Sequence, residues 1–305
     1  MSRPLRFAPE RSLVLVTQRT FQGRLLLRPS EELNDLVLGL LGKVQARYGM
    51  VLHACVFLSN HFHLLVSPDS AHQLADFLRS FTARLAHEVG RLHGWEGPVF
   101  PLRYKSSPVS DEEAAQVQWL RYILAHGCKE GLVARPTDWP GVHAASALAE
   151  GRFLEGHWID RSALCEARRR KQGPDLAAFR HRAEVRFTPL PCWAALPAAV
   201  YRSRIQGLLE EIERELAPLT ESSASGVVGR AAIQSQHPHT PVPPPPKRRA
   251  PWALAATRDA RRALVQAYRD FVQAFREAAR KLKQGARDVV FPPWSFPPPL
   301  PRPGG

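Results

Sequence analysis

The sequence predicts an α+β fold, in which helices cover an antiparallel sheet mainly on one face and a basic helical extension follows. Three observations lead to this prediction. Strand-like and helix-like segments alternate in the order βαββαβα over the first half of the chain. A short hairpin joins two strands between the helices, and after about residue 151 the pattern changes to basic, helical and proline-rich segments. The first half therefore follows the split βαβ plan.

The first strand and the first helix follow from apolar spacing. Residues 12–18, SLVLVTQ, are β-branched and apolar, as in a buried strand. Ser30 can cap a helix that runs to about Tyr48, because apolar residues repeat behind it at helical spacing. These residues are Leu33, Leu36, Leu40, Val44 and Tyr48.

Two further strands and a second helix come next. Residues 50–58 and 61–66 are apolar runs that predict strands, and the connection between them is short enough for a hairpin. Residues 73–90 predict a helix with one apolar face. That face consists of Leu74, Phe77, Phe81, Leu85 and Val89.

A fourth strand and a third helix complete the first half. Residues 104–109 predict a short strand. Asp111 opens a helix that runs to about His126, because the acidic run Asp111-Glu112-Glu113 is favourable at the positive end of a helix dipole.

The whole chain divides into four predicted regions. A folded domain occupies 1–155, a helical extension 156–221, a proline-rich basic linker 222–251, and a basic amphipathic helix with a proline-rich tail 252–305. The linker has low complexity and ends in the basic run Lys247-Arg248-Arg249. A helix is predicted over 257–284 from its apolar stripe. The stripe consists of Leu264, Tyr268, Phe271, Phe275, Ala278 and Leu282.

Charge and composition narrow the classes of function. The 305 residues carry a formal net charge of +14, which favours a polyanionic partner, with nucleic acid ahead of a membrane surface. Residues 1–160 hold 17 Lys+Arg against 16 Asp+Glu, whereas residues 161–305 hold 25 against 12. The excess charge therefore lies in the second half, which we expect to hold the nucleic-acid backbone.

The expected location is the cytoplasm. No stretch approaches the ~18 apolar residues of a membrane span, and the N-terminus lacks the apolar core of a signal peptide. The four cysteines are scattered without a CxxC pair, which is typical of reduced thiols. We therefore expect no membrane partner.

Two histidines share one face of the third predicted strand. Side chains alternate along a strand, so His61 and His63 project together while Phe62 faces the other way. Two imidazoles on one face suit a divalent metal ion. The alternative is a pair of unrelated histidines, one packed and one exposed.

A tyrosine and a histidine form a second pair on the third predicted helix. Tyr122 and His126 are four residues apart and therefore lie on the same helical face. A tyrosine beside a metal can attack a phosphodiester in line, while the metal polarises a non-bridging oxygen. The alternative is a half-buried core aromatic residue with its hydroxyl at the rim.

Several sequence blocks resemble one family of enzymes. Residues 59–66, SNHFHLLV, resemble the HUH motif of the IS200-like single-tyrosine transposases, and most closely the REP-associated branch, where it typically reads PNHFHLLV. Residues 103–106, RYKS, resemble that branch's GRFKS or GRYKS strand. Residues 120–123, 131–133 and 135–140 resemble its RYIxxNPVRAGLVxxPxDYPWSS block. The blocks occur in the family order within roughly residues 11–150.

The resemblance implies a fold, a reaction and a site. The fold is a ferredoxin-like or RRM-like HUH domain, which assigns the IS200-like catalytic domain to residues 1–155. The reaction is metal-dependent cleavage and rejoining of single-stranded, hairpin-forming DNA through a 5′-phosphotyrosine. Position by position, His61 and His63 would be metal ligands, and Tyr122 the nucleophile.

The chain departs from the family at the third ligand. The family places Asn or Gln four residues after the tyrosine, followed by Pro, whereas this chain has His126 and Gly127. Histidine is a competent ligand, and three imidazoles favour Mn²⁺ or a softer ion over Mg²⁺. The next residues, Cys128-Lys129-Glu130, also differ from the family's VRA. The alternative is a domesticated or inactive relative that binds structured DNA without cutting it.

Candidate DNA-binding residues lie outside the histidine and tyrosine set. Arg103 and Lys105 alternate on the fourth predicted strand, where they either contact phosphate or line a solvated edge. The C-terminal candidates are Lys247, Arg248, Arg249, Arg261 and Arg262. The expected partner is single-stranded or hairpin DNA. A homodimer and a monomer are both compatible with the sequence.

Overall fold

A computed structural model describes residues 5–7, 9, 12–170, 173–221, 226–243 and 252–298. Its central sheet has four strands in the order β2-β3-β1-β4, and every neighbouring pair is antiparallel. The strands are β1 (Val14–Arg19), β2 (Val51–Leu58), β3 (His61–Ser67) and β4 (Lys105–Pro108). The predicted α+β fold, the antiparallel sheet and the hairpin between β2 and β3 are confirmed.

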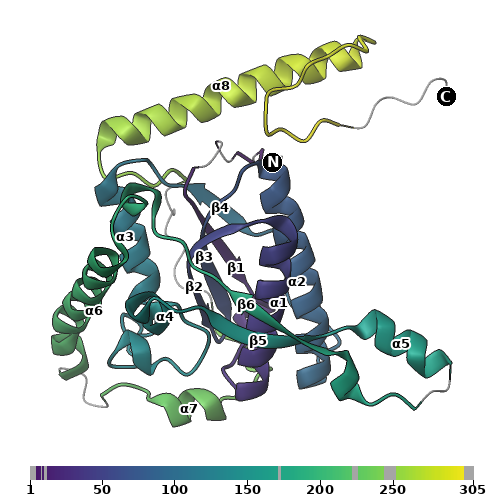
Figure 1. The fold of residues 1–305 in the computed structure, drawn as a ribbon. Helices are drawn as coiled ribbons and strands as arrows, with labels where there is room; N and C mark the ends of the chain where they lie inside the picture. Colours follow the sequence, from purple (N-terminus) through teal and green to yellow (C-terminus); the bar gives the residue numbers. More distant parts are fainter. Residues whose placement is uncertain are drawn as a thin grey trace.

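Two long helices cover one face of this sheet, and a third lies on the other face (Figure 1). The first two are α1 (Glu31–Tyr48) and α2 (Ala71–His93); the third is α3 (Glu113–Leu124). Ser30 caps α1 by accepting a hydrogen bond from the Leu33 amide, as its side chain is expected to do. Phe62 packs with its ring 5.8 Å from that of Phe81 on α2, so β3 turns its apolar side toward α1 and α2.

Helix α3 is shorter than its prediction at both ends. Glu112 stands before the helix, because its carboxylate accepts hydrogen bonds from the hydroxyls of Ser110 and Thr257. Gly127 has a φ of 92°, a left-handed conformation that ends the helix, so His126 lies in the turn behind Leu124. The predicted span from Asp111 to His126 is therefore corrected to Glu113–Leu124.

A second, two-stranded sheet packs on the outer side of α1. It consists of β5 (Leu154–Ile159) and β6 (Arg180–Val185), which pair antiparallel. Gly39 and Gly42 of α1 permit this close approach: a Cβ at Gly39 would lie 2.1 Å from the main chain of His157. The region 156–221 is thus not wholly helical, and the predicted boundary at residue 155 falls inside β5.

The remaining elements surround these two sheets. The α-helices are α4 (Ala145–Glu150), α5 (Arg161–Arg169), α6 (Ala198–Glu221), α7 (Arg230–Ser235) and α8 (Arg258–Lys283). Short 3₁₀ helices occupy Phe21–Gly23, Pro136–Asp138, Leu176–Phe179 and Pro191–Trp193. Helix α6 packs against α3 and α4. Among the described residues, no helix is both long and apolar enough to cross a membrane.

The C-terminal half differs in part from the extended linker and helix predicted for it. The helix predicted over 257–284 is confirmed as α8, with Thr257 as its cap. By contrast, the predicted linker contains α7, and the chain after α7 packs on the first domain: the Leu25 amide donates to the Thr240 carbonyl at 3.2 Å. Figure 1 shows α7 and α8 at opposite ends of the central sheet. The basic run 247–249 lies outside the described residues.

Candidate metal and tyrosine site

Three imidazoles from two separate parts of the chain meet on the α3 face of the central sheet. His61 and His63 project from β3, and His126 reaches them from the turn after α3. One ring nitrogen of each residue lies within 4.8 Å of the others. The ring centroids of His63 and His126 are 4.5 Å apart. The structure therefore brings together the three residues that the sequence proposes as ligands.

Hydrogen bonds orient the three rings. Nδ1 of His126 lies 2.6 Å from the Tyr122 carbonyl, and Nδ1 of His61 lies 2.6 Å from Asn60 Oδ1. Both partners are acceptors, so in each ring Nδ1 carries the proton and Nε2 keeps its lone pair. Nδ1 of His63 lies 2.8 Å from the Thr17 hydroxyl, which can accept in the same way. Nε2 of His61 and of His126 is thus free of a proton, and Nε2 of His126 also lies 4.0 Å from the Glu130 carboxylate.

Burial keeps these imidazoles neutral. It is the main cause that lowers the pKa of His61 to about 4, with the charges of Arg19 and Lys129 adding to the effect. The pKa values of His63 and His126 lie well below the ordinary value, again chiefly because of burial. Neutral imidazole is the form that binds metal, so the set fits a divalent ion at neutral pH.

Tyr122 borders the same cluster. Its ring centroid lies 4.5 Å from that of His126 and 5.4 Å from that of His63. On its other side Trp119 packs at 4.9 Å. Burial, followed by the charge of Glu130, raises the pKa of the Tyr122 hydroxyl. The phenol is therefore protonated at neutral pH and needs a proton acceptor before it can act as a nucleophile.

Two charged residues at the site were not singled out from the sequence. The Lys129 ammonium lies 3.5 Å from the centroid of the Tyr122 ring, and burial lowers the pKa of Lys129 to about 8. Glu130 lies 3.7 Å from Lys129 and accepts a hydrogen bond from the Gly127 amide at 2.7 Å. One sequence feature could have identified them: residues 128–130 differ from the VRA of the family motif, and Lys129 stands in place of its arginine.

Strand register places two more cations on the site's face. Lys105 lies opposite Thr17, and Thr17 lies opposite His63, so all three side chains share one face of the sheet. Arg19, which the sequence did not indicate, lies opposite His61. Arg103 precedes β4 and lies outside the strand that was predicted to carry it. Arg261 and Arg262 are exposed on α8, away from this cluster.

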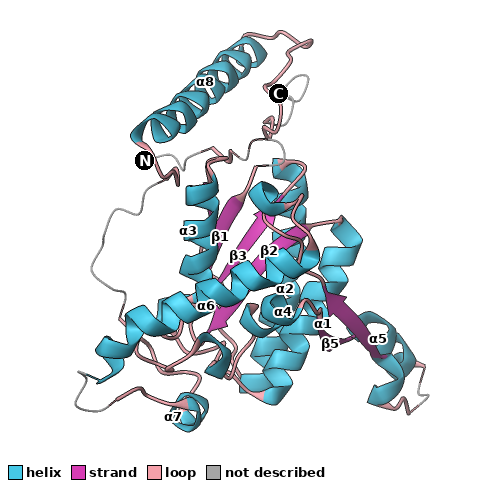
Figure 2. Ribbon diagram, turned by 60° about the vertical axis from the view of Figure 1, so that its left-hand side comes forward, coloured by secondary structure: helices cyan, strands magenta, loops and turns pink. Residues whose placement is uncertain are grey.

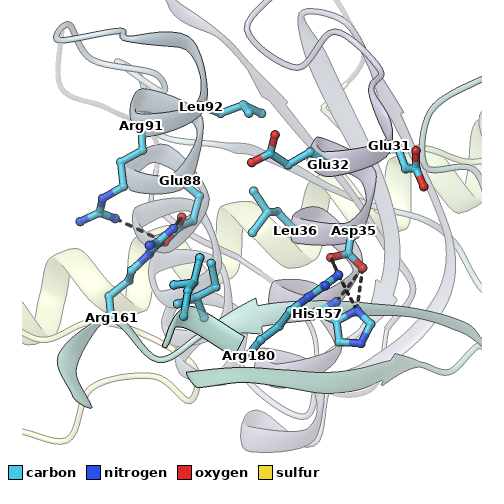
Figure 3. Close-up of a pocket in the computed structure, with 12 residues that line it drawn as sticks. Glu31, Glu32, Asp35, Leu36, Glu88, Arg91, Leu92, His157, Arg161 and Arg180 are labelled. Carbon is cyan, nitrogen blue, oxygen red and sulfur yellow. Dashed lines mark hydrogen bonds and ion pairs between the residues drawn. The ribbon is translucent and has the colours of Figure 1, made fainter. Parts of the chain in front are cut away.

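A separate cleft of about 620 Å³ lies between α1, α2 and β5, on the far side of α1 from the sheet (Figure 3). Its arginines are paired with carboxylates. Arg161 makes a two-pronged ion pair with the buried Glu88, and Arg180 pairs with Asp35 at 2.8 Å. His157 also contacts Asp35 at 2.8 Å. This network attaches β5, β6 and α5 to the two long helices.

The solved structures similar to this chain include two transposases. No family model and no curated protein matches the chain. A REP-associated tyrosine transposase bound to a REP hairpin is 18% identical, with a TM-score of 0.42 over 50% of this chain and 89% of that one. A candidate transposase from Deinococcus radiodurans R1 is 20% identical, with a TM-score of 0.29 over 39% of this chain and 95% of that one. Both TM-scores lie below 0.5, so the functional proposal rests on side-chain geometry.

Proposed function

We propose that the chain is a single-tyrosine HUH transposase of the IS200-like, REP-associated type, which cleaves and rejoins single-stranded, hairpin-forming DNA. One observation carries this proposal. His61, His63 and His126 form a compact imidazole set, and Tyr122 packs directly against it. These residues come from two segments about 60 positions apart in the sequence. His61, His63 and Tyr122 match the family motifs, and His126 stands where the family has Asn or Gln.

The reaction is a transfer of one phosphoryl linkage. The Tyr122 oxygen attacks the phosphorus, a bond between them forms, and the bond to the 3′ oxygen breaks. The tyrosine proton is given up and the leaving 3′ oxygen takes one, so the charge balances. The 3′ hydroxyl can later attack the phosphotyrosine, which rejoins the strand without an external energy source.

The imidazole set would hold the divalent ion. When bound, such an ion polarises a non-bridging phosphate oxygen and stabilises the charge that develops there. Three neutral nitrogen ligands favour Mn²⁺ or a softer ion over Mg²⁺, which prefers oxygen. Arg19, Lys105 and Lys129 add positive charge around the same point and would contact the phosphates that flank the cleaved bond.

A second candidate function is binding of structured DNA without cleavage. It is favoured by the raised pKa of Tyr122, which keeps its hydroxyl protonated, and by His126 in place of the family's Asn or Gln. The two functions share the DNA partner and differ in the covalent step.

A covalent-trapping experiment separates them. The chain is incubated with a labelled single-stranded hairpin and Mn²⁺ or Mg²⁺, and a shifted band is sought on a denaturing gel. We expect an adduct with the native chain and none with Tyr122→Phe, while both bind the hairpin. Normal binding without an adduct under either ion would establish the binding function instead. An adduct that persists in Tyr122→Phe would place the nucleophile elsewhere.

A further inference from the structure

We infer that Arg24 and Arg28, continued by Arg19, form a phosphate-binding strip that guides single-stranded DNA to the site. The identity of the strand rests on the proposed function, whereas the existence of an anion-binding strip rests on the contacts of these three residues. All three lie in or just after β1, in the nearly neutral first half of the chain.

The three guanidinium groups are held by main-chain carbonyls. Arg28 donates to the Gln234 carbonyl at 2.6 Å, and Arg24 donates to the carbonyl of His239. Arg19 donates more weakly to the Val242 carbonyl at 3.5 Å. Within the described part of the chain, no Asp or Glu side chain forms an ion pair with any of the three.

This kind of contact fixes a guanidinium without neutralising it. A carbonyl is uncharged, and an arginine has five N–H donors, so donors and the full positive charge remain after one or two such bonds. The Nε atoms of Arg24 and Arg28 and Nε2 of the neighbouring His93 are buried without a hydrogen-bond partner. The two arginines thus keep a positive charge that no carboxylate offsets, and a bound anion would offset it.

Three other described arginines have carboxylate partners instead. Arg161 and Arg180 in the cleft of Figure 3 are each neutralised by a carboxylate. Arg182 on β6 is paired with Glu155 and Glu184. Arg24 and Arg28 thus differ from these three arginines, because main-chain carbonyls hold them and no carboxylate offsets their charge.

The strip is continuous with the site. Arg19 lies opposite His61 in the sheet. The segment 228–242, which supplies the three carbonyls, starts beside the site as well: the Val228 amide donates to the Gly131 carbonyl at 3.0 Å, next to Lys129 and Glu130. Anion-binding side chains thus lie along this segment and also at the site where it begins. A phosphodiester chain, with its series of charges, could contact both places, whereas an isolated anion could contact only one.

Salt dependence of binding tests the strip. Arg24→Gln with Arg28→Gln is compared with the native chain, and Arg182→Gln is the matched control because carboxylates already neutralise Arg182. Binding of a fluorescent single-stranded hairpin is measured by anisotropy over a range of salt concentrations. Each lost phosphate contact lowers the slope of log K against log salt by about 0.7 for a single strand, so the double variant should lose about 1.4. The control should keep the native slope.

A charge-preserving variant separates phosphate binding from a structural role. Arg24→Lys with Arg28→Lys loses the forked donor geometry toward the carbonyls but keeps both charges, so it should retain most of the salt slope. The proposal would be overturned if the folded double glutamine variant kept the native slope. It would also be overturned if the double lysine variant lost as much of the slope as the double glutamine variant. Covalent trapping is read separately. A reduced slope without any adduct would leave the strip in place and remove only the cleavage function.

Discussion

At the scale of single residues, each imidazole of the site is oriented by a hydrogen bond at its Nδ1 atom. Asn60, Thr17 and the Tyr122 carbonyl hold the three Nδ1 atoms. His126 therefore takes its orientation from the backbone of the tyrosine it accompanies. Under the proposed function, His126 would offer Nε2 as a ligand, because Nδ1 binds that carbonyl.

The Thr17 hydroxyl should tune metal affinity without binding the ion. Thr17→Val removes its contact with His63 while keeping the shape and strand preference of the side chain. Loss of such an outer partner typically weakens a metal site by about 10- to 100-fold, and we expect that loss in Mn²⁺ titration calorimetry. Thr82→Val on α2, whose hydroxyl bonds only its own helix, is the control. Equal Mn²⁺ affinity in both variants would contradict the assigned orientation of His63.

His143 should make the chain sensitive to acid. Burial lowers its pKa to about 4, and its Nδ1 accepts a hydrogen bond from the Ala145 amide at 3.0 Å, which a protonated nitrogen cannot do. Between about pH 6.5 and 4 the unfolded chain binds this proton and the folded chain does not. The free energy of unfolding therefore falls as pH falls, by about 1.4 kcal/mol per unit for one histidine.

Urea unfolding at several pH values measures this contribution. His143→Gln should flatten the acid limb by about that slope, although it lowers the stability near pH 7. His87→Gln, on an exposed position of α2, serves as the comparison and should keep the native limb. An unchanged limb in His143→Gln would show that other groups dominate acid unfolding.

At the scale of elements, glycines shape two helices around the site: Gly127 ends α3, and Gly39 and Gly42 let a second sheet pack on α1. Gly127 ends α3 with a φ of 92°, which proline cannot adopt, so the turn after His126 differs from a turn built around the family's proline. Its amide also donates to Glu130, a bond that proline would remove. On α1, Gly39 and Gly42 admit the β5–β6 sheet to the side away from the histidines.

Gly39→Ala should loosen the β5–β6 sheet and spare the site. The added Cβ would meet the main chain of His157 at 2.1 Å, which no side-chain rotation relieves. Overpacking of this kind costs about 1–3 kcal/mol, measurable as a lower midpoint in thermal unfolding. Gly207→Ala on α6 meets nothing within 4 Å and should be neutral or slightly stabilising. A Gly39→Ala midpoint equal to that of Gly207→Ala would contradict the tight contact.

At the scale of the whole molecule, positive charge is available at two separate places. Helix α8 is attached near Glu112, before α3 begins, whereas the histidine and tyrosine cluster lies at the other end of α3. Twelve residues of helix span about 18 Å. Figure 2 shows α8 at one end of the molecule, beyond the end of the sheet. The arginines of α8 are thus placed to hold DNA at a distance from the site, and Arg24 and Arg28 to hold it close by.

The two basic surfaces should act independently. Arg261→Gln with Arg269→Gln, both exposed on α8, should lower the salt slope by about 1.4. Adduct formation at saturating DNA should stay unchanged, because neither residue is near Tyr122. Sites this far apart usually contribute additively, so a fourfold variant with Arg24→Gln and Arg28→Gln should lose about twice that slope. Anisotropy over a salt series gives both values. A fourfold variant no weaker than either pair would indicate that only one surface meets the DNA.

The sequence by itself determined the local elements and the chemistry-bearing residues. Strand alternation separated His61 and His63 from Phe62, and helical spacing placed Tyr122 beside His126, because these relations depend only on neighbours along the chain. Only the tertiary structure decided that the two pairs meet, because that distance depends on how α3 packs across the sheet.

The tertiary structure also decided which arginines keep their charge. Arg161 and Arg28 look alike in the sequence, yet one faces the carboxylate of Glu88 and the other the carbonyl of Gln234. In both cases the partner lies more than 70 positions away in the chain. A local sequence pattern therefore does not predict whether the guanidinium is neutralised. The same long-range contacts order segment 228–242, whose low complexity predicted a linker, since its main-chain carbonyls bind side chains of the first domain regardless of the residues that carry them.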